Sequence, residues 1–169
     1  MTKERPFVTY LESLREDRGA LAALRRGLGQ PPGTAREMYR YVVPWLPSEP
    51  RPQQESVHYL VAALFGYHPQ VGGAGNVGRA FARTVAQGDN TTAVERRFTA
   101  LLTAHVEDLP FYLRQAISFL KSKEVPVDWH QLFTDLMAWD HPDRYVQQQW
   151  ARGFWARRRE EDQNTTEEA

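Results

Sequence analysis

Residues 57–65 read Val-His-Tyr-Leu-Val-Ala-Ala-Leu-Phe, and the spacing of their apolar side chains is repeated along most of the chain. Val57, Val61 and Leu64 lie three or four positions apart, which places them on one face of an α-helix. No segment alternates apolar and polar residues between turn signals, as a β-strand would. The sequence therefore predicts an all-α protein, a compact bundle of about eight helices.

Breaks in this spacing predict where helices begin and end. Apolar positions within residues 7–28 form one stripe, so a single first helix is predicted to end in the glycine- and proline-rich region 27–33. Thr91 or Thr92 is predicted to cap a later helix, because Glu95 lies three residues after Thr92 and completes a capping box. Both signals are local, since they concern the backbone groups that a helix end leaves unpaired.

The chain is predicted to have two helical parts and a tail. A boundary near residues 105–110 divides an N-terminal helical subdomain, residues 1–105, from a C-terminal helical subdomain, residues 106–159. Residues 160–169 are polar, acidic and free of aromatic side chains. Such a segment buries too little apolar surface to fold, so this acidic tail is predicted to be disordered.

Arginine dominates the basic residues, at 18 of 21. Residues 160–169 carry five acidic residues and no basic one, so the remainder has 21 basic against 16 acidic residues, a net charge of +5. Close pairs occur at Arg25/Arg26, Arg96/Arg97, Arg36/Arg40 and Arg79/Arg83. Guanidinium groups match phosphate oxygens, so these pairs predict a polyanion-binding face. A GC-rich or heat-adapted genome that prefers arginine is the alternative explanation.

Composition argues against catalytic and metal chemistry. Cysteine is absent, which excludes disulfides and thiolate metal sites. The five histidines show no metal-binding spacing, and no nucleophile motif is present. We therefore predict no catalytic residue, no metal, no cofactor and no small-molecule substrate.

The sequence also predicts the compartment. The first ten residues include Lys3, Glu4 and Arg5, and no apolar run follows them as in a signal peptide. No stretch approaches the roughly 20 apolar residues that span a bilayer. We expect a soluble, cytoplasmic protein without a membrane partner.

Residues 73–78, Gly-Ala-Gly-Asn-Val-Gly, match the dinucleotide-binding fingerprint G-x-G-x-x-G. That motif needs a strand before it, whereas the segment before residue 73 is predicted to be helical and then contains the turn residues 66–69. A dinucleotide site is therefore not predicted. Two interpretations remain: a helix N-terminus whose amides hold a phosphate beside Arg79 and Arg83, or a loop that uses glycine for its turns.

Most aromatic residues fall on the apolar stripe of their predicted helix, so core packing is the default expectation. Tyr39, Tyr112, Trp129 and Trp155 do not, and they are the candidates for exposure. An exposed ring can stack on an unpaired base, which contributes about 1–3 kcal/mol per base.

A set of short stretches, in a specific order and spacing, gives the chain a family resemblance. The stretches are Leu24-Arg25-Arg26 followed by Pro31-Pro32-Gly33; Tyr41-Val42-Val43-Pro44; His58-Tyr59-Leu60-Val61-Ala62-Ala63-Leu64; Val77-Gly78-Arg79-Ala80; Val94-Glu95-Arg96-Arg97-Phe98 with Leu101-Leu102; Leu113-Arg114-Gln115-Ala116; and Val146 with Trp150-Ala151-Arg152. Together they cover most of residues 7–155. The chain resembles the small subunit of the type I-E CRISPR surveillance complex Cascade, the CasB family.

The resemblance implies an all-helical subunit without catalytic activity, present in more than one copy along the inner face of a ribonucleoprotein. Its implied partners are other Cascade subunits, including a second copy of itself, the guide RNA and the target DNA, especially the displaced strand. In that family the subunit helps to hold the R-loop. Such contacts can matter because exchanging a DNA duplex for an RNA–DNA hybrid is nearly neutral in free energy.

The resemblance also implies which residues bind nucleic acid. Matching positions carry Arg25, Arg26, Arg79, Arg96, Arg97, Arg114 and Arg152, while Arg83 and Arg36 lie close by. We include Arg83 in the predicted nucleic-acid-binding set, which then has eight members. The longer glycine-rich loop at residues 72–75 and the tail depart from the family pattern.

Two functions from other classes compete with this one. The first is a helical scaffold whose basic face binds acidic protein partners, which predicts salt-insensitive association and no crosslinks to DNA or RNA. The second is a phosphate-using enzyme built around residues 73–78, which predicts nucleotide binding by the purified chain.

Overall fold

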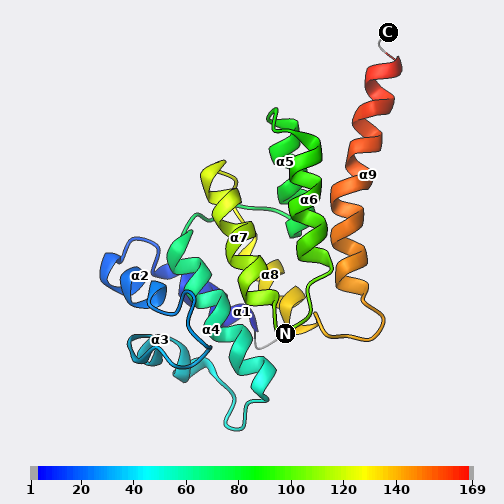
Figure 1. The fold of residues 1–169 in the computed structure, drawn as a ribbon. Coiled ribbons are helices and arrows are strands. Elements are labelled where there is room, and N and C mark those ends of the chain that lie inside the picture. The colour runs from blue at the N-terminus through cyan, green and yellow to red at the C-terminus, as the bar shows by residue number, and fades with distance from the viewer. Residues whose placement is uncertain (1–3, 168–169) are drawn as a thin grey trace. The chain divides into compact units, whose positions relative to one another are not determined.

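The computed structural model describes the backbone of residues 4–167 and the side chains of residues 6–156. Within the described residues the chain is helical and contains no strand (Figure 1), so the all-α prediction is confirmed. The elements are α1 (Glu4–Ser13), α2 (Arg18–Arg25), η1 (Arg36–Met38), α3 (Tyr39–Val42), η2 (Val43–Trp45), α4 (Pro52–Tyr67), α5 (Val77–Ala86), α6 (Thr91–Leu102), α7 (Leu109–Ser122), α8 (Trp129–Met137) and α9 (Tyr145–Glu167), where η marks a 3-10 helix.

The chain forms two compact units rather than one. The first unit comprises Met1–Val71 and Trp129–Ala138, so it contains α1 to α4 together with α8. The second comprises Gly72–Asp128 and Trp139–Ala169, with α5, α6, α7 and α9. The boundary that the sequence analysis placed after residue 105 lies inside the second unit, between α6 and α7.

Two local predictions are corrected. The single first helix is two helices, because the chain turns between Ser13 and Arg18 and restarts with Asp17, whose carboxylate accepts a hydrogen bond from Ala20 N at 3.0 Å. The cap of α6 is Asn90 rather than a threonine: its side-chain oxygen accepts from Ala93 N at 3.0 Å. Asp and Asn rank above Thr as N-caps, which agrees with the caps at both positions.

The core of the first unit gathers around α4. His58 is buried, and its ring lies 4.9 Å from the rings of both Phe7 on α1 and Phe133 on α8. α2 crosses α4 at Gly66, where an added Cβ would lie 2.7 Å from the Cβ of Leu24. This close approach brings α2 and its C-terminal arginines against the end of α4.

The core of the second unit is aromatic. Phe98 on α6 packs against Phe154 on α9 and Phe81 on α5, with ring centroids 4.8 and 5.4 Å apart. α5 and α9 cross in direct contact, because a Cβ at Gly78 would collide with the carbonyl oxygen of Trp150. Only glycine permits this crossing, since any side chain would push the two backbones apart.

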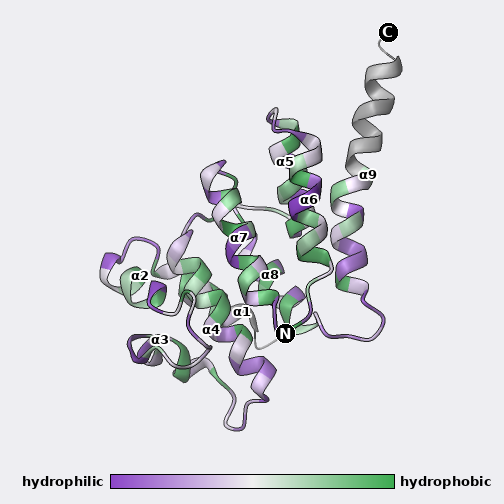
Figure 2. Ribbon diagram, viewed as in Figure 1, coloured by the Kyte–Doolittle hydropathy of each residue, from purple (hydrophilic) through white to green (hydrophobic). Residues whose placement is uncertain are grey.

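Most helices bury one face, whereas α4 is buried on all sides over residues 57–66, apart from the half-buried Leu60. Figure 2 shows hydrophobic and hydrophilic residues alternating along the helices. α9 runs to Glu167, so the disorder predicted for residues 160–169 is not confirmed; residues 168 and 169 lie outside the described residues. No helix in the described part of the chain is long and apolar enough to cross a membrane.

Candidate nucleic-acid interface

The predicted arginines fall into two groups, one in each unit. Arg25 and Arg26 end α2 in the first unit. The second unit carries the other members, which are Arg79 and Arg83 on α5, Arg96 and Arg97 on α6, Arg114 on α7 and Arg152 on α9. Arg83 is half-buried and the remaining seven are exposed. The structure therefore places most of the predicted set on four helices of one unit, and we describe each group by itself.

The two arginines of the first unit have different surroundings. The Arg25 guanidinium donates a hydrogen bond to the backbone carbonyl of Gly66 at 3.0 Å, which connects α2 to the last turn of α4. Among the described residues, the Arg26 side chain forms no hydrogen bond or ion pair. Arg26 is therefore available for an external anion, whereas Arg25 already has an internal acceptor.

The glycine-rich loop holds α5 rather than an anion. The amide of Gly75 donates to the Asp128 carboxylate at 3.3 Å, and Arg83 donates to the carbonyl of Ala74 at 2.6 Å. Asn76 caps α5 by accepting from Arg79 N at 3.1 Å. Because a carboxylate already accepts from a loop amide, the loop is a poor phosphate cradle, and the interpretation of glycine for turns is favoured.

An open groove runs between α6 and α7, with a volume of about 550 Å³. Its lining residues are Arg97, Phe111, Arg114, Gln115, Ser118, Phe119 and Ser122. The Arg97 guanidinium carbon lies 5.0 Å from the centroid of the Phe119 ring, a cation–π contact that holds the guanidinium over the groove. The structure thus brings Arg97 and Arg114, from different helices, to one concave surface that contains no carboxylate.

The carboxylate nearest in sequence to the α6 arginines points elsewhere. Glu95 accepts a hydrogen bond from the Trp155 indole at 2.6 Å, which ties α6 to α9. Among the described residues, none of the seven exposed predicted arginines forms an ion pair. No described carboxylate pairs with these charges, so Arg96, Arg97 and Arg114 keep unpaired positive charge on α6 and α7 of the second unit.

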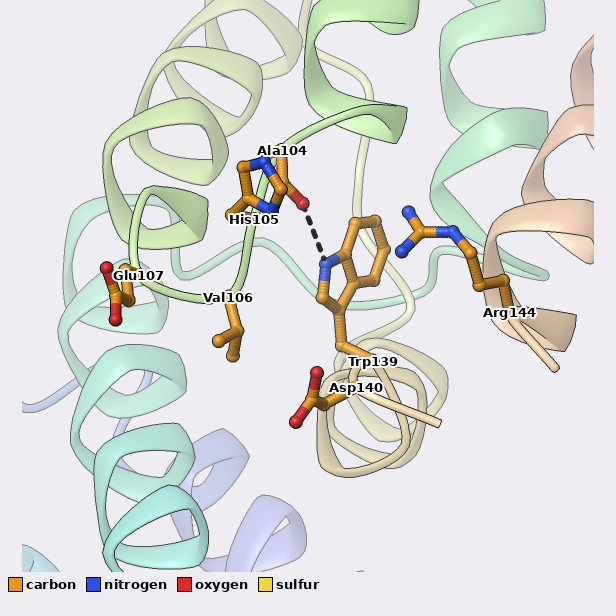
Figure 3. A pocket seen from close by; sticks show the side chains of 7 residues that line it. All are labelled: Ala104, His105, Val106, Glu107, Trp139, Asp140 and Arg144. Atoms are coloured by element: carbon orange, nitrogen blue, oxygen red, sulfur yellow. Dashed lines mark hydrogen bonds between the residues drawn. The ribbon is translucent and has the colours of Figure 1, made fainter. Parts of the chain in front are cut away.

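A second pocket, of about 400 Å³, lies where the chain leaves α6 and enters α9 (Figure 3). The indole of Trp139 donates to the carbonyl of Ala104 at 3.3 Å, and the carboxylates of Glu107 and Asp140 line the pocket together with Arg144. Mixed charge of this kind does not favour a polyanion. No group of three or more histidine, aspartate or glutamate side chains in the described part of the chain could hold a metal ion.

The exposed aromatic residues were only partly predicted. Tyr39 is exposed, as expected, whereas Trp129 is 1% exposed and its indole donates to the carbonyl of Gln70 at 3.1 Å, so that prediction is wrong. Tyr112 and Trp155 are half-buried. Phe111 is 59% exposed and was not among the residues predicted to be exposed. The signal was present, because Phe111 lies off the stripe that Leu109, Leu113 and the later core positions of α7 form.

Comparison with known proteins identifies the family. The family model described as CRISPR-associated protein Cse2 matches residues 20–155. A CRISPR-associated protein Cse2 from Thermus thermophilus is 36% identical over 168 residues, which cover 95% of each chain. A crystal structure of a Cse2-family protein, also from Thermus thermophilus, has a TM-score of 0.79 at 36% identity and covers 92% of this chain and 99% of its own.

A solved structure called a CRISPR RNA-guided surveillance complex contains a similar chain. That chain has a TM-score of 0.80 at 27% identity, over 94% of this chain and 96% of its own length. The resemblance seen in the ordered sequence stretches is thereby confirmed by the family model, by a relative in sequence and by solved structures. The chain belongs to the CRISPR-associated Cse2 family, to which the name CasB is also given.

Proposed function

We propose that this chain is a subunit of a CRISPR RNA-guided surveillance complex, and that it stabilises the R-loop by binding nucleic-acid backbone through exposed arginines. The observation that carries the proposal is the match, over almost its whole length, to a chain of such a complex. Its partners would be the other subunits, a second copy of itself, the guide RNA and the target DNA. The family resemblance, rather than a contact within this chain, supports the second copy.

The arrangement of the arginines supports backbone binding. Arg26, Arg96, Arg97 and Arg114 are exposed, and none has a carboxylate partner among the described residues. A guanidinium without an internal partner can give both edges of its fork to a phosphate. Such contacts carry no sequence information, which suits a subunit of a complex whose guide RNA reads the sequence.

Binding without catalysis is also part of the proposal. Stabilisation of an R-loop needs no chemical step, because the exchange of base pairs is close to neutral and backbone contacts shift its equilibrium. Incubation of the purified chain with labelled DNA and RNA tests this point, and cleavage or modification of either would contradict it.

Membership of the complex is tested by co-purification of a tagged chain from cells that express the whole system. We expect guide-sized RNA and the other subunits to elute with it. Elution of the chain alone would contradict the proposal, whereas salt-insensitive association with an acidic protein and no RNA would favour the scaffold alternative.

The role of the arginines is tested with a triple variant of the assembled complex, Arg26→Ala, Arg96→Ala and Arg97→Ala. Each lost phosphate contact lowers the log–log salt dependence of single-strand binding by about 0.7, so we expect a decrease of about 2 for target-DNA binding, with assembly intact.

The matched control removes Arg15, Arg18 and Arg40, which are also exposed and carry the same total charge. Arg40 lies over the Tyr41 ring at 5.3 Å, as Arg97 lies over Phe119. An equal loss of binding in both variants would show an effect of net charge only, and no loss in the first would overturn the proposed site.

A further inference from the structure

We propose that the groove between α6 and α7 is a nucleotide subsite, in which Phe111 stacks on one unpaired base of the displaced DNA strand and Arg97 and Arg114 bind the flanking phosphates. The inference deepens the proposed function and rests on it. It adds a base contact, and therefore a fixed position on the strand, to a surface otherwise expected to bind backbone alone.

Phe111 is unusual among the aromatic side chains of the chain. It is 59% exposed, more than any other large hydrophobic residue among those described, and the single described aromatic ring that it contacts is that of the neighbouring Tyr112, at 5.3 Å between centroids. A single exposed apolar residue is ordinary by itself. What distinguishes Phe111 is its place in a groove that also holds two guanidinium groups.

The two guanidinium groups supply the charge that a nucleotide requires. Arg97 comes from α6 and Arg114 from α7, and neither forms an ion pair within the described residues. α7 contains no acidic residue, and the single acid of α6, Glu95, is bonded to Trp155 on α9. Among the residues that line it, the groove therefore joins an aromatic face to two positive charges and has no carboxylate, the combination that binds single strands.

The polar lining is suited to a nucleotide rather than to an apolar ligand. Gln115 is exposed and offers both an amide donor and a carbonyl acceptor to the groove. The volume of about 550 Å³ falls within the range of about 300–1,000 Å³ that small-molecule sites occupy.

The displaced strand is the source of the base because stacking needs a base that is not paired. In an R-loop the guide RNA and the target strand pair with each other, which leaves the displaced strand single. The groove lies mostly along α7, with Arg97 of α6 at its side, and it is open to solvent, so a strand can enter and leave it.

The test uses the assembled complex bound to target DNA in which 2-aminopurine replaces single bases along the displaced strand. Stacking quenches 2-aminopurine fluorescence, so we expect quenching at one position or a few adjacent ones, and its loss in the Phe111→Ala complex. Target affinity should fall by roughly five- to tenfold, the lower end of the loss expected for one base–aromatic stack. Phe111→Tyr keeps a ring and should behave as the natural protein does.

The matched control is Val43→Ala, which removes another exposed apolar side chain, 50% exposed, from the first unit. It should change neither quenching nor affinity. Quenching that is unchanged in Phe111→Ala would overturn the subsite, as would Phe111-dependent quenching only when the analogue is in the guide RNA. Loss of complex assembly in Phe111→Ala would also overturn it, because Phe111 would then bind protein.

Failure of the subsite and failure of the proposed function are distinguishable. If the Arg26, Arg96 and Arg97 variant weakens binding while Phe111→Ala does not, the proposed function stands and the subsite is wrong. If neither variant changes binding, both are wrong.

Discussion

The pairs Arg25–Arg26 and Arg96–Arg97 have the same signature in the sequence and different surroundings in the structure. In the first unit, Arg25 donates to the carbonyl of Gly66, so one member of the pair joins two helices. In the second unit, Arg96 is exposed without a partner among the described residues and Arg97 lies over an aromatic ring. Adjacent arginines therefore do not imply equal roles. A guanidinium close to a free backbone carbonyl donates to it and stabilises the fold, whereas one without such an acceptor can bind an external anion.

The difference follows from helix ends. Arg25 is in the last turn of α2, where the chain reaches the end of α4 and finds carbonyl groups that no helical amide satisfies. Arg96 and Arg97 lie in the middle of α6, where every carbonyl nearby has a partner in the next turn. A guanidinium in mid-helix has no such acceptor, and it remains available to a phosphate.

The largest effect on stability is expected at the crossing of α5 and α9, in the unit that carries Arg96 and Arg97. Gly78→Ala places a methyl group against the carbonyl of Trp150 and should separate α5 from α9. We expect a loss of about 3 kcal/mol in the free energy of unfolding, measured by urea denaturation, because overpacking of this kind forces backbone shifts.

Gly19→Ala is the control for this prediction. A Cβ at Gly19 meets only the Asp17 carboxylate, at 3.5 Å, so this exposed helical position should gain up to about 1 kcal/mol from the better helix former. A Gly78→Ala protein as stable as the natural one would show that the α5–α9 crossing adapts freely. The unit that carries Arg96 and Arg97 would then be less rigid than the close contact at Gly78 indicates.

The second prediction compares the two arginine pairs in binding. Replacement of both Arg96 and Arg97 by alanine should lower the log–log salt slope of target binding by about 1.4, which is roughly a sevenfold smaller change in affinity between about 50 and 200 mM salt. The same measurement on Arg25→Ala with Arg26→Ala should show about half that decrease, since Arg25 has an internal acceptor. Equal salt slopes for the two double variants would contradict the different roles inferred for the two pairs.

The third prediction concerns stability instead of binding, and here the larger effect is expected at Arg25, in the first pair. Arg25→Ala should lower the free energy of unfolding by about 1 kcal/mol, through loss of the bond to Gly66 O. Arg26→Ala should change it by less than about 0.5 kcal/mol, as for an exposed side chain that has no hydrogen bond or ion pair among the described residues. Thermal denaturation of the two single variants gives the answer, and identical melting temperatures would contradict the structural role of Arg25.

Local features of this fold could be predicted from the sequence, whereas contacts between distant segments could not. The spacing of Val57, Val61 and Leu64 predicts a buried helix face, and all three are fully or nearly fully buried. The bond from Arg25 to Gly66 joins positions 41 apart in sequence, and nothing in either segment indicates that α2 crosses α4 there. Periodicity identifies the face of a helix that is buried, but not the helix that covers it.

The aromatic residues show the same limit. Trp129 was a candidate for exposure, although it stands three, four and seven positions before Leu132, Phe133 and Leu136, the spacing of one buried face of α8. The acceptor of its indole, the carbonyl of Gln70 in the loop after α4, is what the sequence does not indicate. Phe111 lies off the stripe of α7 and could have been predicted as exposed. Its neighbours in the groove come from α6 as well, so the groove itself requires the packing of the two helices.

The smallest effect concerns α4, the helix whose Gly66 carbonyl accepts the hydrogen bond from Arg25. The pKa of the Tyr59 hydroxyl on α4 is raised above its ordinary value of 10.0, first by burial and then by the nearby Glu55 and Tyr39. A raised pKa means that the fold favours the neutral phenol, so its contribution to stability is present below about pH 10 and is lost as the pH rises beyond it. Arginine keeps its charge at these values, so alkaline pH weakens the packing of α4 without removing the charge of Arg25. We therefore expect the free energy of unfolding from urea titrations to fall less between about pH 9 and 11 in Tyr59→Phe than in the natural protein. An identical fall in both would assign the alkaline loss to other groups, such as Tyr10, whose pKa burial also raises.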